Sequence, residues 1–87
     1  MNYYPAFLNL QGKKAVVIGG GKVAERKVFA LVKSGAEITV VSPKLTRGLL
    51  KAKSEKIIRH VSRHYREGDI EGAFLVISAT DSPARPT

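Results

Sequence analysis

The strongest chemical signal in this sequence is a run of three glycines. Residues 19–24 read GGGKVA, which matches the pattern G-x-G-x-x-A of loops that bind the diphosphate of a dinucleotide. We expect Gly19 to permit a tight turn, Gly21 to let the backbone approach the diphosphate, and Ala24 to let a helix lie close to a strand. The free N–H groups at the start of that helix would complete an anion-binding site.

The residues around the glycines predict the elements that would position them. Residues 13–18 form a short β-branched run, typical of a strand buried on both faces. From Lys22 onwards apolar residues recur at helical spacing until Ser34-Gly35, where a helix would end. Residues 38–41 are again rich in β-branched side chains. A glycine loop between a strand and a helix favours dinucleotide binding over a purely structural turn.

The rest of the chain predicts a helix over residues 45–53 and a strand near a sheet edge over residues 57–65. It also predicts a turn or a single helical turn over residues 66–72 and a buried strand over residues 73–79. This order predicts an α/β fold, a Rossmann-like parallel sheet with strand order 3-2-1-4 and right-handed crossovers, incomplete as a doubly wound fold. Residues 3–12 would form an arm at an edge. We expect residues 1–87 to be a single domain.

The acidic residue that usually binds the ribose, about 20 positions beyond the glycines, is missing. Ser42 stands at that place, followed by Pro43 and Lys44, with Arg47 nearby. A serine among cations is compatible with a free ribose and with the 2′-phosphate of NADP. The two cations could equally be solvated charges at the start of a helix. The residues alone leave this choice open.

Composition restricts the class of protein further. The formal net charge is +8, which favours polyanionic partners. The sequence has no cysteine, which removes disulfides and thiolate metal sites and fits a cytoplasmic location. No apolar run approaches the length of a membrane span and no signal peptide is evident, so we expect no membrane partner.

Residues 59–66 form the densest basic run. Nucleic-acid proteins usually interleave such charge with several stacking aromatic residues, and here Tyr65 stands alone, so we expect no nucleic-acid partner. His60 and His64 would share a strand face at about 13 Å, too far apart for one metal. We expect no metal site.

Three further segments are informative as a set. They read YPAFLNLQGK at residues 4–13, VIGGGKVAERK at residues 17–27 and FLVISATD at residues 74–81. Together they resemble the NAD-binding module of siroheme synthases, the precorrin-2 dehydrogenase and sirohydrochlorin ferrochelatase family. The similarity covers nearly the whole chain, and the pairing of the second segment with the third is far more specific than the glycines alone.

The resemblance implies an oxidoreductase that binds NAD and dehydrogenates precorrin-2 to sirohydrochlorin, with iron insertion in bifunctional members. NAD is therefore the expected cofactor, although the residues are also compatible with NADP. The substrate would be a tetrapyrrole polycarboxylate, which suits a basic chain. By position, the resemblance implies contacts of Gly21, Lys22 and Val23 with the diphosphate, of Ser42, Pro43 and Lys44 with the adenosine ribose, and of Ala79, Thr80 and Asp81 near the nicotinamide.

The family continues after its Thr-Asp with a helix, a further strand and a dimerisation region, which do not follow Asp81 here. We therefore expect the chain to be the first part of such an enzyme. Asp81 is the candidate acid or base, or else the cap of a helix. The alternative function is a non-catalytic NAD(P)-binding module, regulatory or vestigial. An uncovered sheet face at Val17, Phe74 and Val76 predicts self-association, in the simplest case a homodimer.

Overall fold

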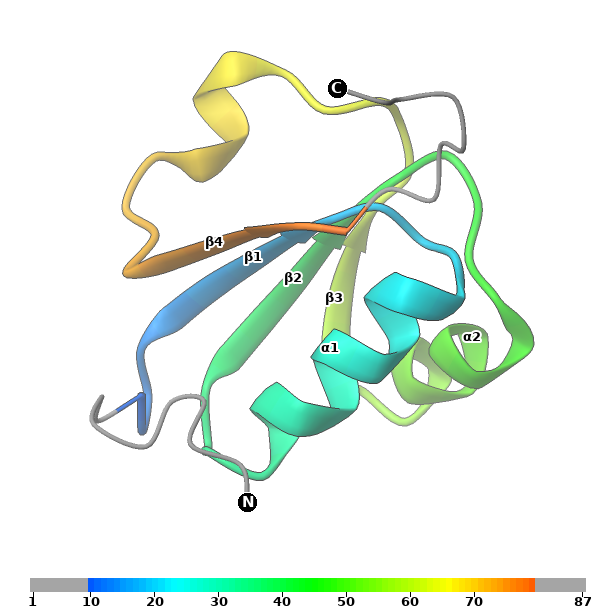
Figure 1. Ribbon diagram of the computed structural model, residues 1–87, viewed down its shortest axis with the longest axis horizontal. Coiled ribbons are helices and arrows are strands. Elements are labelled where there is room, and N and C mark those ends of the chain that lie inside the picture. The colour runs from blue at the N-terminus through cyan, green and yellow to red at the C-terminus, as the bar shows by residue number, and fades with distance from the viewer. Residues whose placement is uncertain (1–9, 80–87) are drawn as a thin grey trace.

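The computed structural model describes residues 10–79, which form a parallel sheet with helices (Figure 1). The elements are β1 (Lys14–Ile18), α1 (Lys22–Val32), β2 (Glu37–Val41), α2 (Arg47–Ser54), β3 (Ile58–Val61), the short 3₁₀ helix η1 (Glu67–Ile70) and β4 (Leu75–Ser78). The four strands pair in the order β3-β2-β1-β4, and all pairs are parallel. The predicted fold class and strand order are confirmed. Most of the predicted arm over residues 3–12 lies outside the described residues.

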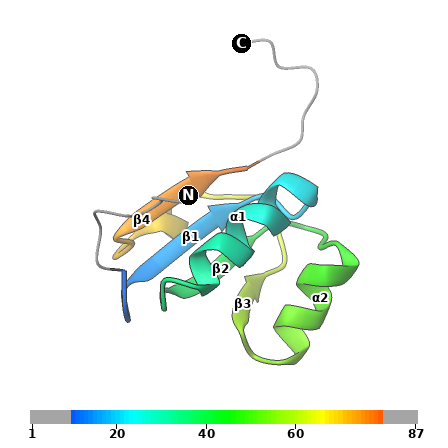
Figure 2. The same ribbon diagram turned by 60° about the horizontal axis from the view of Figure 1, so that its bottom comes forward.

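β1 is a central strand, and its register places it between two partners. Ala15 lies opposite Ile38 of β2 and opposite Leu75 of β4. Side chains alternate along a strand, so Ala15 and Val17 share one face of the sheet. Both belong to the core cluster that contains the buried residues of α1 and α2, and both helices lie on this side of the sheet (Figure 2).

Helix α1 forms and ends as its sequence predicts. Ala24, Val28 and Leu31 are all fully buried on one side of the helix. The helix ends at Val32, and the Gly35 N–H donates a hydrogen bond to the Val32 carbonyl at 3.1 Å. Gly35 has a φ of 80°, a left-handed conformation that glycine adopts without a Cβ clash.

Helix α2 begins two residues later than the predicted start at residue 45. Thr46 is the N-cap, and its hydroxyl oxygen accepts a hydrogen bond from the Leu49 N–H at 3.1 Å. A threonine cap satisfies one of the unpaired N–H groups of the first turn, so the helix begins directly after Thr46. The predicted start at Leu45 was therefore wrong, while the helix itself is confirmed.

Two predicted strands are shorter than expected. β3 covers Ile58–Val61 instead of residues 57–65, and β4 covers Leu75–Ser78 instead of residues 73–79. Among the described residues both are edge strands, as predicted for β3. β4 is not the buried strand that its apolar composition predicts, because β1 is its one partner here and its side chains are exposed or half-buried.

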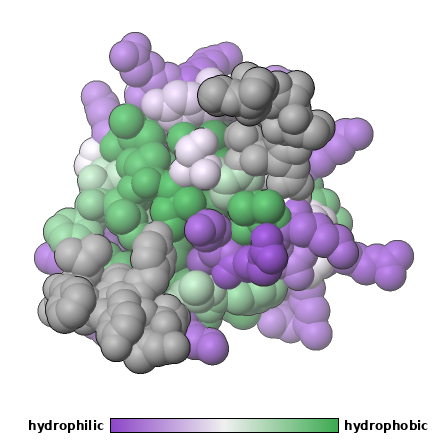
Figure 3. All heavy atoms as spheres, viewed as in Figure 1, coloured by the Kyte–Doolittle hydropathy of each residue, from purple (hydrophilic) through white to green (hydrophobic). Residues whose placement is uncertain are grey.

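The second face of the sheet carries no α-helix among the described residues, and its apolar exposure is concentrated on β4. Phe74 is 51% exposed and Val76 is 41% exposed, and apolar surface gathers over this strand in Figure 3. The expectation that Val17 lies on the uncovered face was wrong. Val17 is fully buried and packs in the helix-covered core.

Candidate dinucleotide-binding site

The glycine loop lies at the carboxyl ends of β1 and β2. Gly19 directly follows β1, and its N–H donates a hydrogen bond to the carbonyl of Val41, the last residue of β2, at 2.9 Å. Its φ of 123° is one that residues with a side chain rarely adopt. The chain turns here between β1 and α1, at the edge of an open α/β sheet where ligands bind.

Gly20, which the dinucleotide pattern leaves unspecified, is required by close packing. A Cβ atom at Gly20 would overlap the carbonyl oxygen of Lys44 and the hydroxyl of Ser42. The Gly20 carbonyl in turn accepts a hydrogen bond from the Thr46 N–H at 3.0 Å. The glycine loop therefore lies directly against the loop between β2 and α2, and that loop contains the predicted ribose-binding residues.

A cavity of about 420 Å³, open to solvent, lies on the surface where these two loops meet. It is lined by Gly19, Gly20, Gly21, Ser42, Pro43, Lys44, Leu45, Thr46 and His64. Five of the predicted cofactor-binding residues are thus brought together at one cavity, namely Gly19, Gly21, Ser42, Pro43 and Lys44. None of the described lining residues is acidic.

Gly21 caps the start of α1 with backbone alone. The first intrahelical bond runs from the Glu25 N–H to the Gly21 carbonyl at 2.9 Å, and the N–H groups before it have no partner within the helix. Gly21 has a φ of −90°, which any residue can adopt. Its conformation therefore does not by itself require glycine.

Lys22 and Val23 are also predicted to contact the diphosphate, but unlike Gly21 they do not line the cavity. Lys22 is the exposed first residue of α1 and adjoins the cavity without lining it. Val23 lines a separate hollow with Arg26, Lys27 and Ala30. Neither residue is therefore among the lining residues of the cavity.

Ser42 is buried, and three hydrogen bonds hold it in the loop between β2 and α2. Its hydroxyl donates to the Lys44 carbonyl at 2.5 Å, its N–H donates to the Val61 carbonyl at 3.1 Å, and its carbonyl lies 2.8 Å from His60 Nε2. The hydroxyl proton is already used, so Ser42 can offer a ribose only an acceptor lone pair. His60 serves as a support for this loop.

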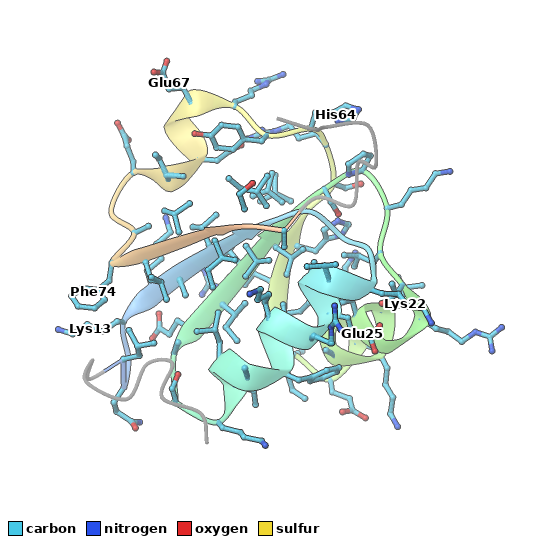
Figure 4. The ribbon with its side chains drawn as sticks, in the orientation of Figure 1. Lys13, Lys22, Glu25, His64, Glu67 and Phe74 are labelled. Atoms are coloured by element: carbon cyan, nitrogen blue, oxygen red, sulfur yellow. The ribbon has the colours of Figure 1, made fainter. Side chains whose placement is uncertain are left out.

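His64 is a residue at this cavity that the sequence analysis assigned to a strand. β3 ends at Val61, and His64 lies on the segment beyond it, near the loop that leaves β2 (Figure 4). The members of the basic run over residues 59–66 have different partners, since His60 binds the Ser42 carbonyl and Arg63 binds Asp69.

Among residues 10–79 no group of three or more His, Asp or Glu side chains could hold a metal ion.

The residues predicted to lie near the nicotinamide follow β4. Ala79 is buried, and its N–H donates to the Ile18 carbonyl at 2.8 Å, which places it beside the end of β1. Thr80 and Asp81 lie outside the described residues.

The cavity fits the adenosine and diphosphate parts of a dinucleotide in its chemistry. One side of the cavity is the glycine loop at the N-terminus of α1, and the other is the loop that contains Lys44 and no carboxylate. Both features favour a bound anion. Glu25, the acidic residue of the first turn of α1, does not line the cavity, and its Oε1 accepts a hydrogen bond from the hydroxyl of the lining residue Thr46 at 2.7 Å.

A parallel sheet in the order 3-2-1-4 with such a glycine loop between β1 and α1 defines a Rossmann-like nucleotide-binding domain. A family model described as "Putative NAD(P)-binding" matches residues 6–86. The chain belongs to this NAD(P)-binding family.

Among residues 10–79 no helix has the length and apolar character needed to cross a membrane.

Several siroheme synthases are similar to this chain. That of Methylobacillus flagellatus is 44% identical over 81 residues, and that of Thioalkalivibrio sulfidiphilus is 42% identical over 81 residues; each match covers 93% of this chain. The chain spans 17% of the length of either relative. Among solved structures, SirC, a precorrin-2 dehydrogenase, matches with a TM-score of 0.83 and 29% identity over 90% of this chain and 39% of SirC.

Proposed function

We propose that this chain forms the cofactor-binding part of an NAD-dependent precorrin-2 dehydrogenase of siroheme biosynthesis. Residues 1–87 would be one NAD(P)-binding Rossmann domain, acting in the cytoplasm on a tetrapyrrole polycarboxylate. In the complete enzyme, ferrous iron could be a second substrate. The observation that carries this proposal is the cavity that unites the glycine loop with Ser42, Pro43 and Lys44.

The residues would share the work of holding the cofactor. The backbone N–H groups that follow Gly21 would bind the diphosphate, Lys44 would add positive charge beside the adenosine ribose, and Ala79 with Thr80 and Asp81 would border the nicotinamide. NAD, when bound, supplies the hydride acceptor. Asp81 is the proposed acid or base, and the net charge of +8 would favour a substrate with many carboxylates.

The alternative is a module that binds NAD(P) without turnover. Titration calorimetry of NAD and NADP into the 87-residue chain, followed by incubation with precorrin-2 and NAD, distinguishes the two. Sirohydrochlorin absorbance supports the dehydrogenase, and NAD binding without turnover supports the module. Absence of binding by either dinucleotide contradicts both.

A pair of matched variants tests whether the cavity is the binding site. Gly21→Asp adds a side chain and a negative charge where the diphosphate is expected, and should abolish NAD binding. Gly68→Asp makes the same change on η1, where a Cβ atom would meet nothing within 4 Å, and should leave binding unchanged.

A further inference from the structure

We propose that His64 binds the adenosine ribose, in place of the acidic residue that such sites usually carry after the second strand. The inference rests on the proposed function and extends it to a residue outside both loops of the dinucleotide pattern. Its starting point is that His64 lines the same cavity as Gly19, Ser42 and Lys44.

The first step is the hydrogen-bonding capacity of the cavity. A ribose hydroxyl needs an acceptor, and in most Rossmann sites a carboxylate supplies it. The described lining here has no carboxylate, and its buried Ser42 hydroxyl, which donates to the Lys44 carbonyl, has only a lone pair left for a ligand. A neutral imidazole has one nitrogen that accepts and one that donates, so His64 can replace the carboxylate.

The second step is that the backbone of His64 is held in place. Arg63 makes a two-point contact with Asp69, with Nη1 to Oδ2 at 2.7 Å and Nη2 to Oδ1 at 2.5 Å. Arg63 Nη1 also donates to the His64 carbonyl at 3.2 Å. A bidentate pair of this kind fixes orientation as well as distance. The segment after β3 is therefore anchored on η1 with His64 at the cavity.

The third step is the contrast between the two histidines. Both ring nitrogens of His60 lie near protein atoms, Nε2 at 2.8 Å from the Ser42 carbonyl and Nδ1 at 3.4 Å from Lys53 Nζ. His64 is exposed, and within residues 10–79 its ring has no such contact. His60 thus supports the loop, and the ring of His64 is available to a ligand.

The test uses ADP and 2′-deoxy-ADP, which differ only in the 2′-hydroxyl of the ribose, the group that His64 would bind. Calorimetry on the 87-residue chain should show ADP binding about fivefold more tightly than 2′-deoxy-ADP, the value of one hydrogen bond of about 1 kcal/mol. In His64→Ala the affinity for ADP should fall to that for 2′-deoxy-ADP. His64→Gln, which keeps an acceptor, should retain part of the difference.

Arg59→Ala is the matched control, because it removes a cation from exposed β3 surface that does not line this cavity. It should keep the wild-type ratio of the two affinities. If His64→Ala keeps the wild-type ratio of the affinities for ADP and 2′-deoxy-ADP, even with both ligands bound more weakly, the assignment of His64 is overturned. The proposed function would still stand in that case, provided that the wild type binds NAD. Failure of the wild type to bind either NAD or ADP would overturn both.

Discussion

At the scale of single residues, the three glycines of the loop differ in their conformation and contacts. Gly19 has a left-handed φ of 123°, Gly20 touches the neighbouring loop, and Gly21 has an ordinary φ at a helix start. The dinucleotide pattern predicts the first and third. It cannot predict Gly20, because that requirement comes from Lys44, which belongs to another element.

Gly20→Ala should destabilise the fold and disturb the cavity together. The new methyl group overlaps a backbone carbonyl, that of Lys44, so the loops must separate, and we expect a loss of about 1–3 kcal/mol. Urea unfolding measures the loss, and NAD affinity should fall in the same variant. Gly68→Ala, with open space around its Cβ, should change stability by less than about 0.5 kcal/mol. Equal effects of the two substitutions would contradict the packing argument.

Gly48 shows a different constraint between the two helices, because the atoms that a Cβ would meet belong to the end of a side chain and not to the backbone. A Cβ atom there would overlap the carboxylate of Glu25, which accepts a hydrogen bond from Thr46. Alanine gains about 1 kcal/mol of helix propensity, but displacing the carboxylate costs a charge-assisted hydrogen bond of about 1.5–3 kcal/mol. We expect Gly48→Ala to destabilise the wild type by about 1 kcal/mol.

In the Glu25→Ala background the sign of that effect should reverse. With the carboxylate gone, Gly48→Ala retains its gain of about 1 kcal/mol. Denaturant unfolding of the four proteins in this cycle measures the coupling. The same effect of Gly48→Ala in both backgrounds would show that Glu25 is not the cause.

At the scale of elements, the sequence predicted the helices and strands whose pattern of apolar side chains lies within the element itself. The apolar periodicity of α1 and the β-branched runs of β1 and β2 are visible in the chain itself. The end of β3 was missed because alternation continues to Tyr65, while the chain is turned by contacts of Arg63 with Asp69 on η1. His64 was missed for the same reason, although a polar residue after the carboxyl end of a parallel strand is a usable signal.

The Arg63–Asp69 pair makes the stability of the fold dependent on pH. The hydrogen bond from Arg63, with a second from the Arg66 N–H, lowers the pKa of Asp69 to about 2. The unfolded carboxyl titrates near about 3.9, so the pair stabilises the fold above about pH 4 and this contribution is lost as the pH falls towards about 2. The stability difference between the wild type and Asp69→Asn should therefore shrink over that interval.

Urea unfolding at a series of pH values measures this difference, and side-chain NMR of Asp69 gives the pKa directly. Glu67→Gln removes an exposed carboxylate from the same short helix and controls for the change in net charge. A difference between the wild type and Asp69→Asn that stays constant down to about pH 2 would contradict the proposed ion pair.

At the scale of the whole molecule, the described sheet is covered by α-helices on one face and bounded by β4 on one edge. Burial was the least predictable property, since it depends on which elements cover a strand and not on the strand itself. Val76 and Val17 are both valines in strands of the same sheet, yet Val17 is fully buried and Val76 is 41% exposed. The Nζ atom of Lys13 lies 5.4 Å from the centroid of the Phe74 ring. The two residues precede β1 and β4, at the same end of the sheet (Figure 4).

We expect the 87-residue chain to self-associate through the apolar surface of β4. Val76→Lys places a charge in this surface and should reduce association in sedimentation velocity experiments, because burying an unpaired charge is costly. Leu50→Lys is the matched control, since Leu50 is 51% exposed on α2.

The net charge of +8 opposes contact between copies of the chain. Salt screens this repulsion, so association of the wild type should increase with ionic strength. A monomer at all salt concentrations, or equal effects of the two lysines, would refute the role of β4.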